Sequence, residues 1–196
     1  MKIFLRALLI FSLFGAIPYS CSSTTENRIN VDFPTQASRT LGRDQFGEFE
    51  DYTLQDTRVR FYLSTAPTSL STWNGYGTDG GVPRELVSGI FVRSRFGDYE
   101  FPSDLFDDLG DPNIRQSGSH EYVTIQQKDE SLRIGMANSD GAGGYRVLFE
   151  VDLLGGRAQR FVQDHMESTF NRTHKWTTIN KTENKSEQAT PRKLSD

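Results

Sequence analysis

The clearest strand pattern of the chain lies at residues 145–153, which read Tyr145-Arg146-Val147-Leu148-Phe149-Glu150-Val151-Asp152-Leu153. Apolar side chains occupy every second position, and charged side chains occupy most of the positions between them. A period of two places one set on the core face of a β-sheet and the other set toward water. We therefore expect a strand here with one buried face.

Similar patterns extend outward from this stretch. Alternating apolar positions recur at residues 58–63, 122–126 and 132–136. Residues 86–92 are more continuously apolar, which is typical of a central strand. Weaker strand patterns occur near 45–50 and 95–101, and turn residues separate the strongest runs at 128–131, 138–144 and 155–156. The sequence therefore predicts an all-β fold, an antiparallel β-sandwich or barrel-like meander of about seven or eight strands.

Residues 157–170 allow two interpretations. Their apolar side chains fall at helical spacing. However, Gly155-Gly156 directly after a strong strand indicates a hairpin, which would make 157–162 another strand. We favour the hairpin, with a short helix after it as a possible continuation.

The composition excludes several classes of protein. The chain has 196 residues, 22 Lys and Arg against 26 Asp and Glu, and one Cys. This mildly acidic balance argues against a broad nucleic-acid-binding surface. A single Cys excludes a disulfide framework within the chain and a multi-cysteine metal cluster.

The N-terminal residues have the layout of an export signal. Lys2 and Arg6 precede an apolar run from Ala7 to Ile17, and Pro18 ends this run. The run is shorter than the ~20 residues that a membrane-spanning helix needs. We expect residues 1–20 to be an export signal, and the protein to be exported to the cell envelope.

The only thiol lies just after this signal. Ser20-Cys21-Ser22-Ser23 resembles the lipobox of bacterial lipoproteins, in which the Cys becomes the lipidated first residue. Pro18 and Tyr19 depart from the usual Leu and small residue of that motif. The resemblance implies lipidation of Cys21 and membrane anchoring, while ordinary cleavage after Ser22 would give a soluble periplasmic or secreted protein.

The mature chain divides into three parts. Residues 21–40 are polar and are expected to form a tether, and residues 41–170 are expected to form the β-rich globular domain. Residues 171–196 are polar and carry more basic than acidic side chains, so we expect a disordered basic tail.

An acidic run falls within residues 97–112. Calcium takes six to eight oxygen ligands, which loops supply well. Four carboxylates of the run could converge around one ion, although their spacing differs from that of an EF-hand loop: Asp104, Asp107, Asp108 and Asp111. The alternative is a solvated loop or short helix. We expect no cofactor other than this possible Ca²⁺.

A Gly-rich loop carries a candidate ligand contact. Trp73 and Tyr76 offer rings that can stack on a sugar face, and Asn74 and Asp79 offer hydrogen bonds to hydroxyl groups. The alternative for Trp73 is a loop anchor that tucks over the core edge. The three His residues belong to no recognisable metal or nucleophile motif, so no catalytic residue is assigned: His120, His165 and His174.

Residues 88–93 resemble a short strand motif of a known protein family. Ser88-Gly89-Ile90-Phe91-Val92-Arg93 resembles a strand motif of exported, concanavalin-like glycoside-processing domains, but the Trp-Asn segment that follows it in that family is missing. The resemblance covers six residues and implies only a sugar-related alternative.

These observations favour a non-enzymatic function, although they leave catalysis uncertain. We expect a binding or interaction module of the cell envelope, held at a membrane through Cys21, with a carbohydrate or an envelope protein as partner and no nucleic acid. The alternative is an extracellular β-sandwich that binds or processes carbohydrate, using the loop aromatics and the acidic run.

Overall fold

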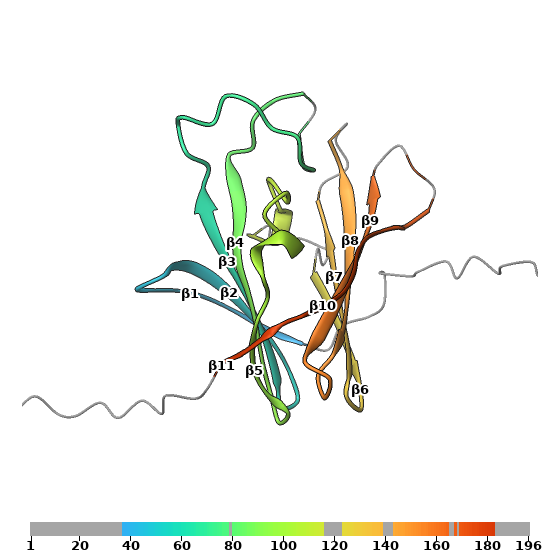
Figure 1. Ribbon diagram of the computed structural model, residues 1–196. Helices are drawn as coiled ribbons and strands as arrows, with labels where there is room; N and C mark the ends of the chain where they lie inside the picture. The colour runs from blue at the N-terminus through green and yellow to red at the C-terminus, as the bar shows by residue number, and fades with distance from the viewer. Residues whose placement is uncertain are drawn as a thin grey trace, which may run out of the picture.

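The protein is an all-β structure of two antiparallel sheets, as the alternation of apolar residues predicts (Figure 1). The computed structural model describes residues 37–78, 80–115, 123–138, 143–164, 167 and 169–182. These residues form eleven strands rather than seven or eight. Within the same residues, no helix has the length and hydropathy needed to span a membrane.

Each sheet is largely a meander. The first sheet has six strands in the order β1 (Ser38–Asp44), β2 (Gly47–Leu54), β3 (Thr57–Thr65), β4 (Glu85–Ser94), β5 (Gly97–Glu100) and β11 (Asn180–Thr182). The second sheet has five strands in the order β10 (Asn171–Thr178), β9 (Arg157–Asp164), β8 (Tyr145–Asp152), β7 (Ser131–Ala137) and β6 (Val123–Lys128). Every neighbouring pair of strands is antiparallel.

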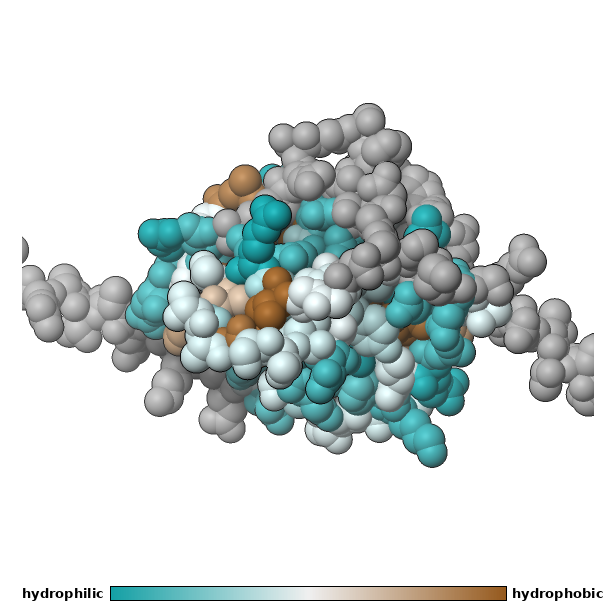
Figure 2. Space-filling model, turned by 90° about the horizontal axis from the view of Figure 1, so that it is seen from above, coloured by the Kyte–Doolittle hydropathy of each residue, from teal (hydrophilic) through white to brown (hydrophobic). Residues whose placement is uncertain are grey.

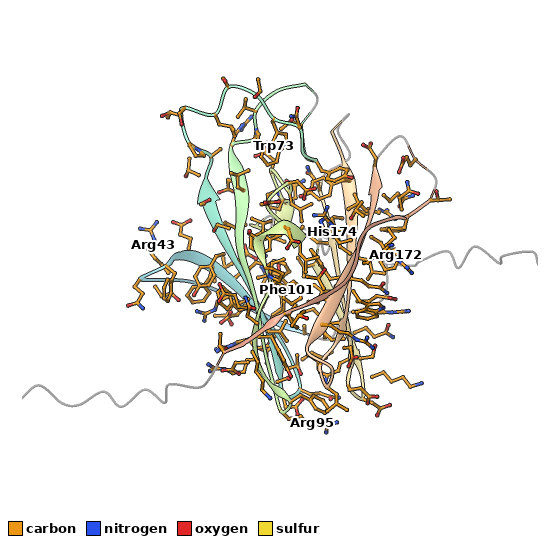
Figure 3. All side chains as sticks on the ribbon, in the orientation of Figure 1. Arg43, Trp73, Arg95, Phe101, Arg172 and His174 are labelled. Atoms are coloured by element: carbon orange, nitrogen blue, oxygen red, sulfur yellow. The ribbon has the colours of Figure 1, made fainter. Side chains whose placement is uncertain are left out.

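The core lies between the two sheets. Val59 and Phe61 of β3 and Val147 and Phe149 of β8 are fully buried. Phe101, which Figure 3 labels between the sheets, meets Phe149 edge to face with ring centroids 5.7 Å apart. Burying such a side chain stabilises the fold by roughly 1.5–3 kcal/mol.

The central strand β4 contains a bulge that shapes the outer face of the first sheet. Gly89 pairs with Tyr62 and Val87 pairs with Leu63, so Ser88 is the extra residue. The bulge lets Val87 and Ile90 both face the core. A Cβ on Gly89 would lie 3.3 Å from the Tyr62 ring, so glycine leaves room for this ring on the outer face.

Strand β9 settles the ambiguity at residues 157–170. Residues 157–164 pair along their whole length with β8, across a turn in which Gly156 has a φ of +61°. The hairpin interpretation is therefore confirmed for 157–162. Glycine adopts this left-handed conformation without steric cost.

The boundaries of the tether and of the tail differ from the prediction. β1 begins at Ser38, and residues 171–182 form β10 and β11 rather than a disordered tail. These strands carry few apolar side chains because they lie at a sheet edge, where backbone pairing holds them. Ile179, between them, is buried and its N–H donates to the Gly156 carbonyl at 2.9 Å. The predicted signal, Cys21 and the segment after Thr182 lie outside the described residues.

Two long connections pack together at one end of the sandwich, here called the loop end. They are residues 66–84 and residues 101–115, the second containing the short 3₁₀ helices η1 (Ser103–Leu105) and η2 (Asn113–Arg115). The Tyr76 N–H donates to the Asp108 carbonyl at 2.8 Å, and the Gly110 N–H donates to the Tyr76 carbonyl at 3.0 Å. These bonds join the two connections.

Candidate functional site

A groove of about 700 Å³ lies on the outer face of the first sheet. Its lining comes from the β1–β2 turn and from β3, β4, β5 and β11, and includes Phe46, Arg60, Tyr62, Phe91, Arg93 and Asp98. The hairpin of β1 and β2 bends away from the rest of the sheet, on the left of Figure 1. Phe46, at the turn of this hairpin, meets Tyr62 of β3 edge to face at 6.2 Å and forms one wall of the groove.

Strand periodicity places these side chains outside. In β3, Val59, Phe61 and Leu63 face the core and are buried. The residues that alternate with them therefore point to the outer face: Arg58, Arg60 and Tyr62. After the bulge of β4, Phe91 and Arg93 continue this face opposite Arg60 and Arg58, their paired residues in β3.

A network of charges holds Arg60 in one orientation. Its guanidinium donates to both carboxylate oxygens of Asp51, at 2.6 and 2.8 Å, and to Asp44 at 2.8 Å. It also lies 3.6 Å from the centre of the Phe49 ring. Such a bidentate, stacked geometry is specific to arginine.

Tyr62 stands at the centre of the aromatic part of the groove. Its ring contacts Phe46, Phe49 and Phe91 edge to face, the last at 5.5 Å. Its hydroxyl donates to Asp44 at 2.6 Å and accepts from Arg60 at 3.1 Å. Burial raises the pKa of Tyr62, and the hydrogen bond from Tyr62 lowers the pKa of Asp44. At neutral pH the phenol is therefore the donor and the carboxylate the acceptor.

The remaining charges of the groove are also paired or exposed. Arg93 donates through Nε to both oxygens of Asp98, at 3.2 and 3.1 Å. Arg58 lies 3.7 Å from Asp51. Glu100 is exposed on β5, two residues beyond Asp98 and on the same strand face. The groove thus presents ordered donors and acceptors around a patch of aromatic rings.

The predicted ligand contacts lie elsewhere, at the loop end, where Figure 3 labels Trp73. The Trp73 indole donates to the Tyr76 carbonyl at 3.1 Å, so it anchors its own loop. Tyr76 packs on Tyr145, with ring centroids 5.9 Å apart. Asn74 is exposed, and Asp79 lies outside the described residues. Figure 2 shows this end, where the described surface is mostly hydrophilic or neutral with small, separate hydrophobic spots. A ligand role for these four residues stays a prediction.

The predicted calcium site is not formed by the described residues. Asp104 and Asp107 are exposed at η1 and after it. Asp108 instead binds Arg160, and Asp111 accepts from the N–H groups of Arg84 and Glu85, at 2.7 and 3.0 Å. Two of the four carboxylates therefore point to different partners, and no group of three or more His, Cys, Asp or Glu in the described chain is arranged to hold a metal ion.

Arg160 is a buried cation that joins the loop end to the second sheet. Its side chain is 1% exposed and projects inward from β9. It donates to Asp108 at 2.8 Å, to the Leu105 carbonyl at 2.9 Å and to Thr173 at 2.8 Å. Burial lowers the pKa of the neighbouring His174, and the Arg160 charge lowers it further. His120 and His165 lie outside the described residues.

Comparison of the chain with family models, with curated proteins and with solved structures gave no significant match. The short motif at 88–93 nevertheless contributes Ser88, Phe91, Val92 and Arg93 to the groove lining. The function of the chain is therefore inferred from the geometry and chemistry of its groove.

Proposed function

We propose that this protein is a non-catalytic binding module of the cell envelope that is exported, tethered through Cys21, and binds its partner in the groove of the first sheet. The observation that carries this proposal is the groove itself. Its volume of about 700 Å³ falls within the ~300–1,000 Å³ of typical ligand sites.

The ordered lining supports binding. Arg60 is held by two carboxylates and by an aromatic ring, and Arg93 is held by Asp98. Side chains that are already ordered lose less conformational entropy when a ligand arrives. Arg60 can therefore contact a partner without first being ordered, whereas Arg93, 59% exposed beside Asp98, is held less firmly.

The same pairs argue against acid–base catalysis. Asp98 and Glu100 are the carboxylates among the described residues that line the groove. Asp98 is held in an ion pair by Arg93. Glycoside hydrolysis commonly uses two carboxyl groups, one as acid and one as base or nucleophile. The ion pair gives Asp98 a role in orienting Arg93, which favours binding over catalysis.

The tether proposal rests on the sequence around Cys21. The chain from Cys21 to the start of β1 at Ser38 reaches at most about 60 Å when fully extended. Mature bacterial lipoproteins carry several acyl chains, and anchoring is durable when more than one chain inserts. An anchored module of this kind would bind partners that lie within the length of this tether from the membrane.

Two variants separate the anchor from the groove. Cys21→Ser is expected to move the protein from the membrane fraction to the soluble fraction, and the intact mass of the membrane form should show the lipid. The Cys21→Ser chain then serves as a lipid-free reporter, and its retention on isolated cell envelopes measures binding by the groove alone.

In that reporter, Phe46→Ala with Phe91→Ala is expected to weaken retention at least about tenfold, as for hot-spot aromatics. Leu154→Ala is the matched control, because Leu154 is 74% exposed and Phe46 is 75% exposed. Equal retention of the groove variant and the control would overturn the proposal.

A further inference from the structure

We infer that the groove binds a neutral saccharide chain. This inference rests on the proposed function, because it names the ligand class of the same groove. Three features of the lining carry it: the balance of charge, the exposed rings, and the pairing of donors with acceptors along the rims.

The charges of the groove do not favour an anion. Three arginines line it, namely Arg58, Arg60 and Arg93. Four carboxylates line it or bind these arginines, namely Asp44, Asp51, Asp98 and Glu100. The lining and its partners therefore carry one more negative than positive charge, which disfavours a phosphate or carboxylate ligand. A ligand without charge leaves every pair intact.

The rings provide apolar contact area. Phe46 is 75% exposed at the β1–β2 turn, and Phe91 is partly exposed on β4, which β3 separates from that hairpin. Tyr62 is 7% exposed and meets both rings edge to face, so it links the two more exposed rings into one patch. A flat ring offers contact area at little entropic cost, and the C–H face of a sugar ring is apolar enough to cover it.

The polar groups around this patch match hydroxyl groups. Arg93 donates and Asp98 accepts, and these two side chains lie within hydrogen-bonding distance of each other on adjacent strands. Exposed Ser64 and Ser88 add hydroxyls, and exposed Glu100 adds an acceptor. A sugar hydroxyl both donates and accepts, so it can bind across such pairs without breaking them.

The test uses the full-length Cys21→Ser chain and four neutral polysaccharides, namely an α-glucan, a β-glucan, a mannan and a xylan, with anionic alginate as contrast. Affinity electrophoresis is expected to show retardation by at least one neutral polymer. Titration with an oligosaccharide of that polymer should give an affinity that changes less than about twofold when salt rises from ~0.05 to ~0.5 M, because no ion pair forms.

Groove variants should weaken this binding selectively. Phe91→Ala and Arg93→Gln are each expected to raise Kd about tenfold. Arg133→Gln is the control, because Arg133 pairs with Glu150 at 3.0 Å on the outer face of the second sheet, as Arg93 pairs with Asp98 at 3.0 Å. Thermal melting of each variant checks that it is folded.

The outcomes distinguish this inference from the proposed function. If no neutral polymer binds while retention on envelopes still depends on Phe46 and Phe91, the saccharide inference is wrong and the binding module stands. Stronger, salt-sensitive binding to alginate would likewise overturn it. Loss of both groove-dependent readouts would overturn the proposed function as well.

Discussion

Two arginines, Arg160 and Arg60, make the same bond in opposite settings. Each donates to both oxygens of an aspartate, and the Nη2 bond measures 2.8 Å in both. The Arg160 side chain is 1% exposed between the sheets, whereas the Arg60 side chain is 20% exposed on the outer face of the first sheet. The aspartates are reversed, because Asp108 is 33% exposed and Asp51 is 10% exposed, so the two settings differ at the guanidinium. Arg160 of β9 holds the connection at residues 101–115, whereas Arg60 binds neighbouring side chains in the groove lining.

The comparison shows that the surroundings of an ion pair decide its role. Removing one partner of a buried pair leaves a charge without compensation, which costs far more than the pair itself contributes. A guanidinium that water can reach, such as that of Arg60, loses less when its partner leaves, because water replaces the partner. The inner pair is therefore expected to govern stability, and the outer pair to govern binding.

The largest expected effect is that of Asp108→Ala. Among the described residues, it leaves the Arg160 cation with the Leu105 carbonyl and Thr173 as partners, so we expect the free energy of unfolding to fall by about 3–5 kcal/mol. Urea denaturation measures it. The double variant Asp108→Ala with Arg160→Met removes the stranded charge and should recover more than half of this loss. A loss below ~1 kcal/mol for Asp108→Ala would show that the two settings do not differ.

Asp51→Ala, the matched change on the outer face, should have a smaller effect on stability. Arg60 keeps Asp44 and the Phe49 ring, so we expect a loss of about 1–2 kcal/mol. Retention on envelopes should fall in this variant, because Arg60 is no longer held in its orientation. Equal destabilisation by Asp51→Ala and Asp108→Ala would contradict the different roles of the two pairs. Unchanged retention of Asp51→Ala on envelopes would contradict the role of Arg60 in binding.

The smallest expected effect concerns His174, which lies beside the inner pair. Because burial and the Arg160 charge lower the pKa of His174 in the folded state, the unfolded chain takes up its proton first as pH falls. Stability should therefore decline as pH drops below the ordinary histidine value of about 6.5. His174→Gln should reduce this decline, measured by urea denaturation on both sides of that pH. An unchanged decline in His174→Gln would assign it to other groups.

The fold could be predicted wherever a strand has one face in the core. Val147, Phe149 and Val151 of β8 alternate with polar residues, and this pattern alone identified the strand. β10 and β11 escaped prediction because edge strands pair mainly through the backbone, which leaves no apolar periodicity in residues such as Arg172 and Lys175.

The groove could be predicted only in part. The alternation at 58–63 shows that Arg58, Arg60 and Tyr62 share one face, but not which strands lie beside them. The groove needs β4 as the neighbour of β3 and a hairpin that brings Phe46 to Tyr62, and both are long-range features. The sequence predicts a ligand contact at Trp73 because an aromatic ring in a Gly-rich loop is typical of such a contact. In the structure its indole also donates to the Tyr76 carbonyl within the same loop, and a ligand contact stays a prediction.

The path of β10 and β11 bears on how the protein is made. One continuous segment runs from the edge of the second sheet to the edge of the first, visible in red in Figure 1. Both sheets are therefore completed by residues 171–182, which leave the ribosome after all the other described residues. A domain folds as a unit, so the nascent chain cannot complete the packing of its two sheets until this segment has emerged.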